Sequence, residues 1–137
     1  MKNIFKTFAL IFLGILFGAC SSKEPNLQTV QKVQLDKYLG TWYEIARYEH
    51  FFEKDCKNVS ANYSMLDTDT IKVINRCTNM LTNEKKEATA KAYAVDDTNS
   101  KLKVSFFRPF YGDYWVLVLD KNYEYVVVGT PSREYLW

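Results

Sequence analysis

The stretch LGTWYEIARYEHFF, residues 39–52, begins with Gly40 and Trp42 and then alternates apolar with polar side chains. A period of two places successive side chains on opposite faces of a β-strand. The same period returns in NVSANYSML, residues 58–66, where apolar side chains stand at every second position. Both stretches therefore predict strands with one face turned toward a dry interior.

Alternating segments recur at roughly even spacing along the chain. We predict seven strands before the C-terminus, at residues 42–48, 58–66, 70–77, 86–95, 101–107, 113–120 and 123–131. The segment 86–95 has alanine at every second position and also fits a helix, but Thr89, Tyr93 and Val95 favour a strand. Short polar turns between sequential strands predict an all-β, up-and-down antiparallel barrel or meander, with a Greek-key sandwich as the alternative.

The N-terminus is typical of a secretory signal peptide, predicted at residues 1–19. Two lysines precede an apolar run at residues 7–17, which is shorter than the roughly 18 residues a transmembrane helix needs. The small residues Gly18 and Ala19 lead into Cys20, and LFGAC resembles the bacterial lipobox. This resemblance implies lipid attachment at Cys20, and Ser21 after it implies sorting to the outer membrane with the domain facing the periplasm. Ordinary secretion with a chance cysteine is the alternative.

Residues 20–34 are poor in large apolar side chains, so we expect a lipid-anchored tether, followed by a single domain at residues 35–137. Without Lys2 and Lys6 the remaining chain carries 16 Lys and Arg against 16 Asp and Glu. A neutral chain lacks the electrostatic attraction on which nucleic-acid binding depends, so we predict no nucleic-acid partner.

Several motifs together resemble those of the lipocalins. They are LGTWYEIARY with Gly40 and Trp42, FEKDC, LKVSFFRPFYGDYW and VVGTPSREYLW. With the lipobox, they closely resemble the bacterial outer-membrane lipocalin lipoproteins, which implies an eight-stranded up-and-down barrel. GDYW, with Gly112, Asp113 and Tyr114, stands where the family's second motif lies, near the closed end. The sequence ends at Trp137, and the resemblance implies that this position lies inside the last barrel strand, before the arginine of the family's third motif.

The resemblance implies a carrier for one hydrophobic ligand, such as a fatty acid or a lysophospholipid. Alternation places seven candidates on the cavity wall: Tyr63, Val73, Ala90, Ala92, Val104, Phe106 and Tyr125. Trp42 is interpreted as a packing anchor at the closed end.

We expect no enzymatic activity, because the sequence contains no catalytic motif. We also expect no cofactor. The alternative function is a membrane-tethered interaction module with a filled barrel, and a weaker alternative is an enzyme with the lipocalin fold. The oligomeric state is left open between a monomer and a homodimer.

Cys56 and Cys77 flank the predicted hairpin at the same end, so a disulfide is expected in an oxidising compartment. Two free thiols are the alternative, because spacing alone proves no geometry.

The single histidine, His50, is too little for a metal site, so we expect none. We expect the carboxylates of Glu44, Glu49 and Glu53 to be solvated. The loop around Phe106, Phe107, Phe110 and Tyr111 is rich in aromatic residues and is expected at the barrel mouth or on the membrane.

Overall fold

The computed structural model describes residues 26–137. The predicted signal peptide and the predicted lipid attachment at Cys20 lie outside the described residues. No helix within the described part of the chain is both long enough and apolar enough to cross a membrane.

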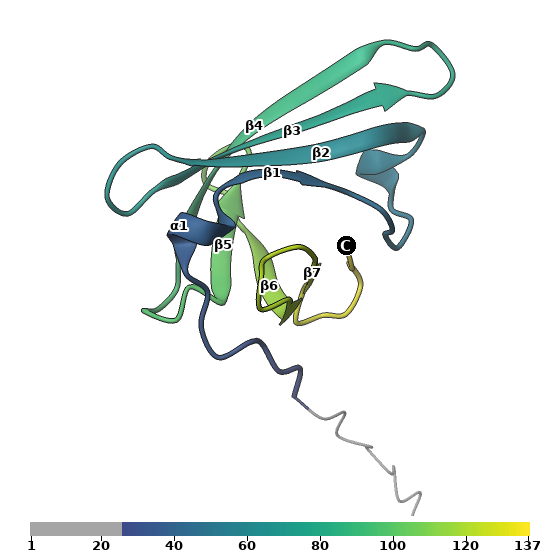
Figure 1. Cartoon of the computed structure of the whole chain (residues 1–137). Helices are drawn as coiled ribbons and strands as arrows, with labels where there is room; N and C mark the ends of the chain where they lie inside the picture. Colours follow the sequence, from purple (N-terminus) through teal and green to yellow (C-terminus); the bar gives the residue numbers. More distant parts are fainter. Residues whose placement is uncertain (1–25) are drawn as a thin grey trace, which may run out of the picture.

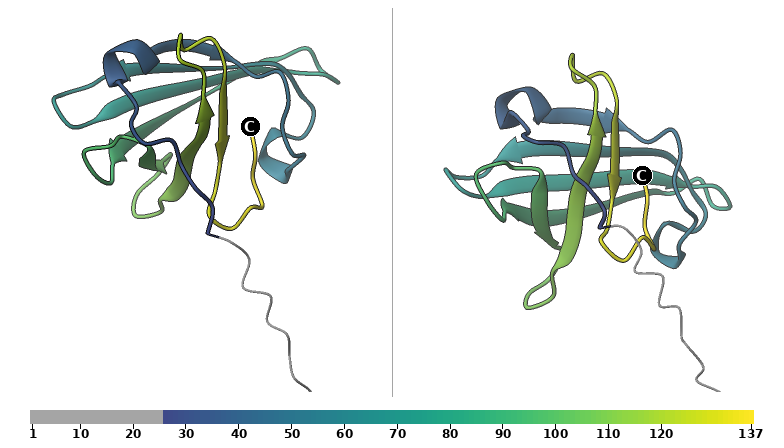
Figure 2. Two further views of the ribbon diagram at one scale, coloured as in Figure 1. Left: turned by 60° about the horizontal axis from the view of Figure 1, so that its bottom comes forward. Right: turned by 90° about the horizontal axis from the view of Figure 1, so that it is seen from below.

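Seven antiparallel strands form one sheet in sequence order (Figure 1). The elements are α1 (Leu35–Tyr38), β1 (Gly40–Tyr43), a 3-10 turn η1 (Phe51–Glu53), β2 (Cys56–Met65), β3 (Ile71–Asn79), β4 (Lys85–Ala94), β5 (Lys101–Ser105), β6 (Gly112–Leu119) and β7 (Val126–Gly129). Each strand pairs with the next one along the chain, so the order is that of an up-and-down barrel and the Greek-key sandwich is wrong. The sheet curls until β6 and β7 face the β1 side (Figures 1 and 2).

The last residues begin the expected eighth strand. Gly129 and Leu136 form an antiparallel bridge, and Val128 and Trp137 exchange two backbone hydrogen bonds of 2.8 Å. On the other side, the Tyr48 amide donates to the Leu136 carbonyl at 2.9 Å. These residues therefore connect β7 with the segment that follows β1.

β1 is shorter than the predicted strand at residues 42–48. It ends at Tyr43, and Ile45, which belongs to the predicted strand, is 93% exposed. Its pairing with β2 ends at Tyr43 and Ser60, next to a β-bulge of β2 between Lys57 and Ser60 in the ladder with β3. The Arg47 side chain then donates to the carbonyls of Glu53 and Cys56, so the backbone beyond β1 follows a loop. By contrast, the alanine-rich segment is a strand, as predicted.

The hydrophobic core lies on the concave face of the sheet. Its fully buried members include Val33, Ile71, Ala92, Leu102 and Val116. Val33 belongs to the predicted tether, residues 20–34, yet it is 1% exposed. The structure therefore places the last part of this segment against the barrel, because two apolar side chains, those of Val30 and Val33, pack on the core.

The meander has two distinct ends. We call the end with α1 and the loops 66–70, 95–100 and 120–125 the closed end. The loops 44–55 and 80–84 lie at the opposite end, together with residues 130–137, and we call it the open end. The loop 106–111 lies beside the middle of β4, because β5 pairs only with Lys91–Ala94 of that strand. The predicted disulfide is confirmed at the open end: Cys56 and Cys77 are bonded, with their Cα atoms 5.5 Å apart. Two free thiols are therefore wrong.

Candidate ligand-binding site

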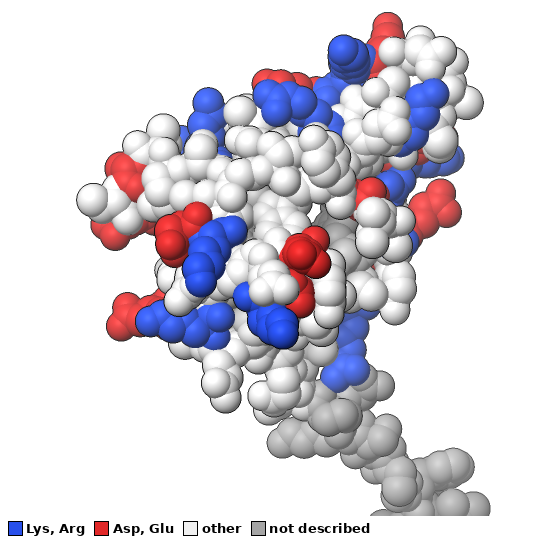
Figure 3. Space-filling view, viewed as in Figure 1, with Lys and Arg blue, Asp and Glu red and all other residues white. Residues whose placement is uncertain are grey.

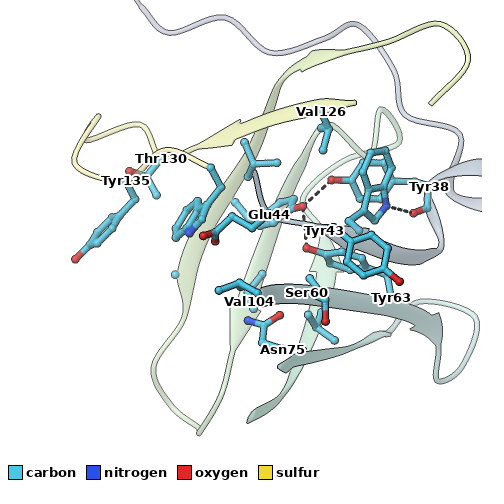
Figure 4. A pocket seen from close by; sticks show the side chains of 18 of the residues that line it. Tyr38, Tyr43, Glu44, Ser60, Tyr63, Asn75, Val104, Val126, Thr130 and Tyr135 are labelled. Carbon is cyan, nitrogen blue, oxygen red and sulfur yellow. Dashed lines mark hydrogen bonds between the residues drawn. The ribbon is translucent and has the colours of Figure 1, made fainter. Parts of the chain in front are cut away.

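A cavity of about 850 Å³ lies inside the curled sheet. Its volume is in the usual range for small-molecule sites. Both edge strands contribute to the wall, β1 through Trp42 and Tyr43 and β7 through Val126 and Val128. Figure 4 shows side chains from several strands converging on this space, with Tyr38 and Tyr63 on one side of it and Tyr135 on the opposite side.

Five of the seven predicted cavity residues line it. They are Tyr63, Val73, Val104, Phe106 and Tyr125. Ala90 and Ala92 do not line the cavity, which corrects the expectation that the alanine row widens it. They are 2% and 0% exposed and belong to the core, where Ala90 pairs with Val73 and Ala92 with Ile71. The space left by their small side chains is therefore filled by neighbouring core residues and is not available to a ligand.

Three tyrosine hydroxyls meet at the closed-end floor of the cavity. The Tyr114 hydroxyl lies 2.6 Å from that of Tyr38 and 3.0 Å from that of Tyr63. Trp42 packs on Tyr38 with ring centroids 5.0 Å apart and donates from Nε1 to its carbonyl at 2.8 Å, an interaction drawn in Figure 4. The placement of Trp42 agrees with a packing role at the closed end, although its ring also borders the cavity.

Burial keeps this tyrosine cluster neutral. Desolvation raises the pKa of Tyr63 to about 12, against the ordinary value of about 10. Burial also raises the pKa of Tyr38 and that of Tyr114. The neighbouring tyrosines add to the rise at Tyr114, whereas at Tyr38 the hydrogen bond with Tyr114 opposes it. The floor of the cavity is therefore an uncharged, hydrogen-bonding surface. Sequence reasoning assigned Tyr114 to a motif but did not foresee that three tyrosines from separate elements meet.

Polar groups gather near the cavity mouth. Glu44 lines the cavity with its side chain only 12% exposed, and it is ion-paired with Arg47. Glu53 is 15% exposed and accepts a hydrogen bond of 3.0 Å from Trp137 Nε1. The expectation that Glu44 and Glu53 are solvated is wrong, because folding of the loop after β1 packs both against other side chains. Desolvation by burial raises the pKa of Glu44 despite the nearby Arg47 guanidinium.

His50 is packed among aromatic rings beside these carboxylates. Its ring stacks on Phe52 at 3.9 Å and meets the edges of Tyr135 and Trp137 at 5.3 and 5.4 Å. Nε2 lies 3.1 Å from Glu53 Oε2, but neither ring nitrogen makes a well-aligned hydrogen bond. Desolvation by burial lowers the pKa of His50. Sequence alone gave no signal for this cluster, because Tyr135 and Trp137 lie more than 80 residues from His50 along the chain.

Each of the two glycines of the predicted motifs opens a strand. Gly40 opens β1 at the closed end with φ of +113°, a conformation that side chains rarely adopt. Gly112 opens β6, and Tyr114 of the same GDYW motif reaches the tyrosine cluster at the closed end. The placement of the whole motif near the closed end stays a prediction. Asp113 forms an ion pair of 2.7 Å with Lys103 on the neighbouring strand.

Within residues 26–137, no group of three or more His, Cys, Asp or Glu side chains is arranged to hold a metal ion. On the face in Figure 3, positive and negative side chains are interspersed and form no large patch of one sign. The chemistry of the site is therefore that of an apolar cavity with hydrogen-bonding groups at its floor and mouth.

A single curled antiparallel meander around an apolar cavity is the architecture of a small ligand-binding barrel. The family model of the lipocalin-like domain matches residues 33–137, and the chain belongs to the lipocalin family. Members of this family are binding proteins. The resemblance identified from the motifs is thereby confirmed.

Relatives with known names agree with this assignment. The chain is 43% identical to the outer membrane lipoprotein Blc of Vibrio cholerae, over 100% of this chain and 79% of that protein. It is also 43% identical to Blc of Escherichia coli K12, over 90% of this chain and 72% of that protein. Apolipoprotein D of Cavia porcellus is 36% identical over 80% of this chain and 57% of that protein. The bacterial relatives locate the chain at the outer membrane.

A solved structure supports the fold independently of close sequence similarity. The cockroach allergen Per a 4 superposes with a TM-score of 0.62, at 19% identity, over 80% of this chain and 70% of that chain. At this identity the likeness concerns the fold alone.

Proposed function

We propose that this protein is a lipid-anchored carrier that binds one fatty acid or lysophospholipid in its cavity and stores or transfers it at the outer membrane. The observation that carries the proposal is the cavity of about 850 Å³, walled by side chains such as Val73, Val104 and Val128. Each methylene of an acyl chain buried there contributes about 0.8 kcal/mol to affinity.

The polar groups of the cavity suit an amphiphile. The tyrosine cluster at the floor is neutral and offers hydroxyl groups, whereas the Glu44–Arg47 pair stands beside the mouth. An acyl chain in the apolar middle would leave its headgroup near this pair, where Arg47 can donate to a carboxylate or phosphate. Lipid attachment at Cys20 would keep the carrier beside the membrane that supplies such ligands.

Native mass spectrometry of the protein purified from membranes tests the proposal. We expect a bound mass that matches a fatty acid or a lysophospholipid, and saturable uptake when palmitate is added to delipidated protein. A protein that carries no lipid and takes up neither ligand would contradict the proposal and favour an interaction module with a filled barrel.

A cavity-filling variant supplies the matched comparison. Val104→Trp places an indole in the cavity wall, whereas Val118→Trp places one at a side chain that is 47% exposed and does not line the cavity. We expect Val104→Trp to weaken palmitate binding by about tenfold or more and Val118→Trp to leave it within about twofold. Circular dichroism of both variants verifies that the fold is retained.

A further inference from the structure

One part of the cavity wall combines carboxylates with aromatic rings. We call these residues the mouth cluster, and its members are Glu44, Phe52, Glu53, Tyr135 and Trp137. The loop after β1 supplies the first three, and the residues that follow β7 supply the other two. In Figure 4, Glu44 lies between the tyrosine cluster of the floor and Tyr135. Two segments that are far apart in sequence therefore build one chemical environment inside the cavity.

The mouth cluster carries an excess of negative charge. Arg47 is ion-paired with Glu44, and its other amino group donates to the carbonyls of Glu53 and Cys56 at 2.9 and 3.3 Å. Arg47 does not itself line the cavity, whereas both carboxylates do. His50 adds no positive charge at about pH 7, because desolvation by burial lowers its pKa. Among these groups, one carboxylate is therefore left without a compensating positive charge.

Each of the two carboxylates keeps one oxygen available to a ligand. Glu44 Oε1 accepts from Arg47, and Glu53 Oε2 accepts from Trp137 Nε1 at 3.0 Å. Among the side chains that the structure describes, none donates to the second oxygen of either carboxylate, and neither of these oxygens is fully buried. An ionised carboxylate accepts several hydrogen bonds, so both groups retain unused acceptor positions.

A buried histidine beside Glu53 is an independent indication that this site lacks a polar partner. The His50 side chain is only 5% exposed, and its Nε2 lies 3.1 Å from Glu53 Oε2. Neither ring nitrogen makes a well-aligned hydrogen bond to any described residue. Buried polar atoms in folded proteins nearly always have a partner, so an unpaired one marks a place that a water molecule or a ligand completes.

The aromatic members of the cluster suit a positively charged group. The rings of Tyr135 and Trp137 stack with centroids 5.8 Å apart and an interplanar angle of 10°, and Phe52 lies 5.6 Å from Tyr135. The faces of aromatic rings are electronegative and attract cations, including quaternary ammonium groups. A neighbouring carboxylate adds charge and accepts hydrogen bonds from a primary ammonium. The same negative charge opposes the approach of an anionic headgroup.

We propose that the mouth cluster selects amphiphiles whose headgroup carries a positively charged amine, of the ethanolamine or choline type, over amphiphiles of equal chain length without one. This proposal rests on the proposed function and deepens it, because the acyl chain still occupies the apolar part of the cavity. The ammonium group lies against the free oxygens of Glu44 and Glu53, and the rings of Tyr135 and Trp137 flank it. The apolar cavity supplies affinity, and the cluster supplies headgroup selection.

Two lysophospholipids that differ only in their headgroup test the selection. The mature protein, freed of bound lipid, is titrated with palmitoyl lysophosphatidylethanolamine and with palmitoyl lysophosphatidylglycerol below their micellar concentrations, and calorimetry gives each Kd. We expect the ethanolamine lipid to bind about tenfold more tightly than the glycerol lipid. Equal affinities, or tighter binding of the glycerol lipid, would overturn the proposal.

Glu53→Gln tests whether the mouth cluster is responsible for the preference. The amide keeps an oxygen that can accept from Trp137 Nε1 but removes the negative charge. We expect this variant to bind the ethanolamine lipid about tenfold more weakly and the glycerol lipid within about twofold of the unaltered protein. Glu84→Gln, at an exposed side chain that does not line the cavity, is the matched control and should keep the full preference.

Binding of the glycerol lipid also shows that the cavity of each variant is folded, so a lost preference does not come from misfolding. A Glu53→Gln protein that keeps the full preference would overturn the assignment of the ammonium group to the mouth cluster.

The ammonium group could belong to an amphiphile or to a small free amine, and phosphoethanolamine without an acyl chain distinguishes the two sources. We expect it to bind at least about 100-fold more weakly than the lysophospholipid, because it buries no acyl methylenes. Equal affinity would overturn the amphiphile as the selected ligand.

Failure of the selection can be told apart from failure of the proposed function. If neither lysophospholipid nor palmitate binds, the carrier function fails and the selection fails with it. If both lysophospholipids bind with equal affinity, the carrier function stands and only the headgroup selection is overturned.

Discussion

Gly40 and Gly112 are the same residue type under different constraints. At Gly40 the backbone has φ of +113°, and this conformation lets α1 lead directly into β1. At Gly112 the backbone is not in that region, and an added Cβ would meet only the Val104 carbonyl oxygen, at 3.9 Å. Only Gly40 is therefore required by backbone conformation.

This contrast predicts the result of two alanine substitutions. Gly40→Ala should lower the free energy of unfolding by about 1–3 kcal/mol, because the side chain forces a strained backbone. Gly112→Ala should change it by less than about 0.5 kcal/mol. Urea denaturation of both variants measures the difference. Equal losses of unfolding free energy in the two variants would show that the positive φ of Gly40 does not require glycine there.

Tyr114 is the centre of the hydroxyl cluster, since it contacts both Tyr38 and Tyr63. Tyr114→Phe should lower the free energy of unfolding by about 1–3 kcal/mol, because two buried hydroxyls lose a hydrogen-bond partner. Tyr125→Phe, at a ring that is 56% exposed, is the control and should cost less than about 0.5 kcal/mol. Urea denaturation measures both, and a loss at Tyr114 no larger than that at Tyr125 would contradict the role of the cluster.

At the scale of elements, strand pairing decided cases that propensity left open. The alanine-rich segment is β4 because β3 and β5 pair with it on both sides. β1 stops at Tyr43 although its sequence continues to alternate, because its pairing with β2 ends at Ser60, next to the β-bulge in the ladder between β2 and β3. Alternation therefore indicates where a strand can form, and the neighbouring strand determines how far it extends.

The short η1 turn and the residues before it position the only histidine of the chain, His50. Burial lowers its pKa below the ordinary value of about 6.5, although Glu53 opposes the shift and Arg47 adds to it. The folded state therefore binds fewer protons than the unfolded state below about pH 6.5. The free energy of unfolding should fall as the pH is lowered from about 7 through this range.

NMR titration of the His50 ring measures this pKa directly, and urea denaturation at about pH 7 and about pH 5.5 measures the loss of stability. His50→Gln should show a smaller loss over the same interval, since the remaining pH dependence comes from carboxyl groups. A ring pKa at or above 6.5 would contradict the prediction.

At the scale of the whole molecule, the N-terminal segment is part of the barrel and not only a spacer. Val33 is 1% exposed in the core, and Asn99 donates from its side chain to the Val33 carbonyl at 3.2 Å. The Gln34 amide donates to the Tyr123 hydroxyl at 2.9 Å, at the same end of the barrel. This packing holds residues 33 and 34 against the closed end of the barrel.

The packing predicts a measurable cost of truncating one side chain. Val33→Ala should lower the free energy of unfolding by about 2 kcal/mol, because it removes buried methyl groups and leaves a cavity. Gln31→Ala, at an exposed position two residues away, should cost less than about 0.5 kcal/mol. Urea denaturation compares the two. A negligible cost at Val33 would show that residues 30–34 act as a tether.

Much of the site follows from strand periodicity and the rest from packing. Tyr63, Val73 and Val104 were predicted on the cavity wall because they occupy the inward positions of their strands. Ala90 shares this inward face, yet core side chains cover it. Periodicity assigns a side chain to a face of the sheet, but it does not say whether that face meets a ligand or another part of the protein.

The sequence by itself determined the approximate positions of the seven strands and the family, because alternation, turns and short motifs are local properties of the chain. It favoured the up-and-down order and a disulfide between Cys56 and Cys77, but left a Greek-key sandwich and two free thiols open. Only the tertiary structure decided that three tyrosine hydroxyls meet, that Glu44 and His50 are buried, and that residues 30–34 pack on the barrel. The physical reason is that each of these features depends on how far the sheet curls. Curling joins elements far apart in sequence, and no local pattern encodes the distance between them.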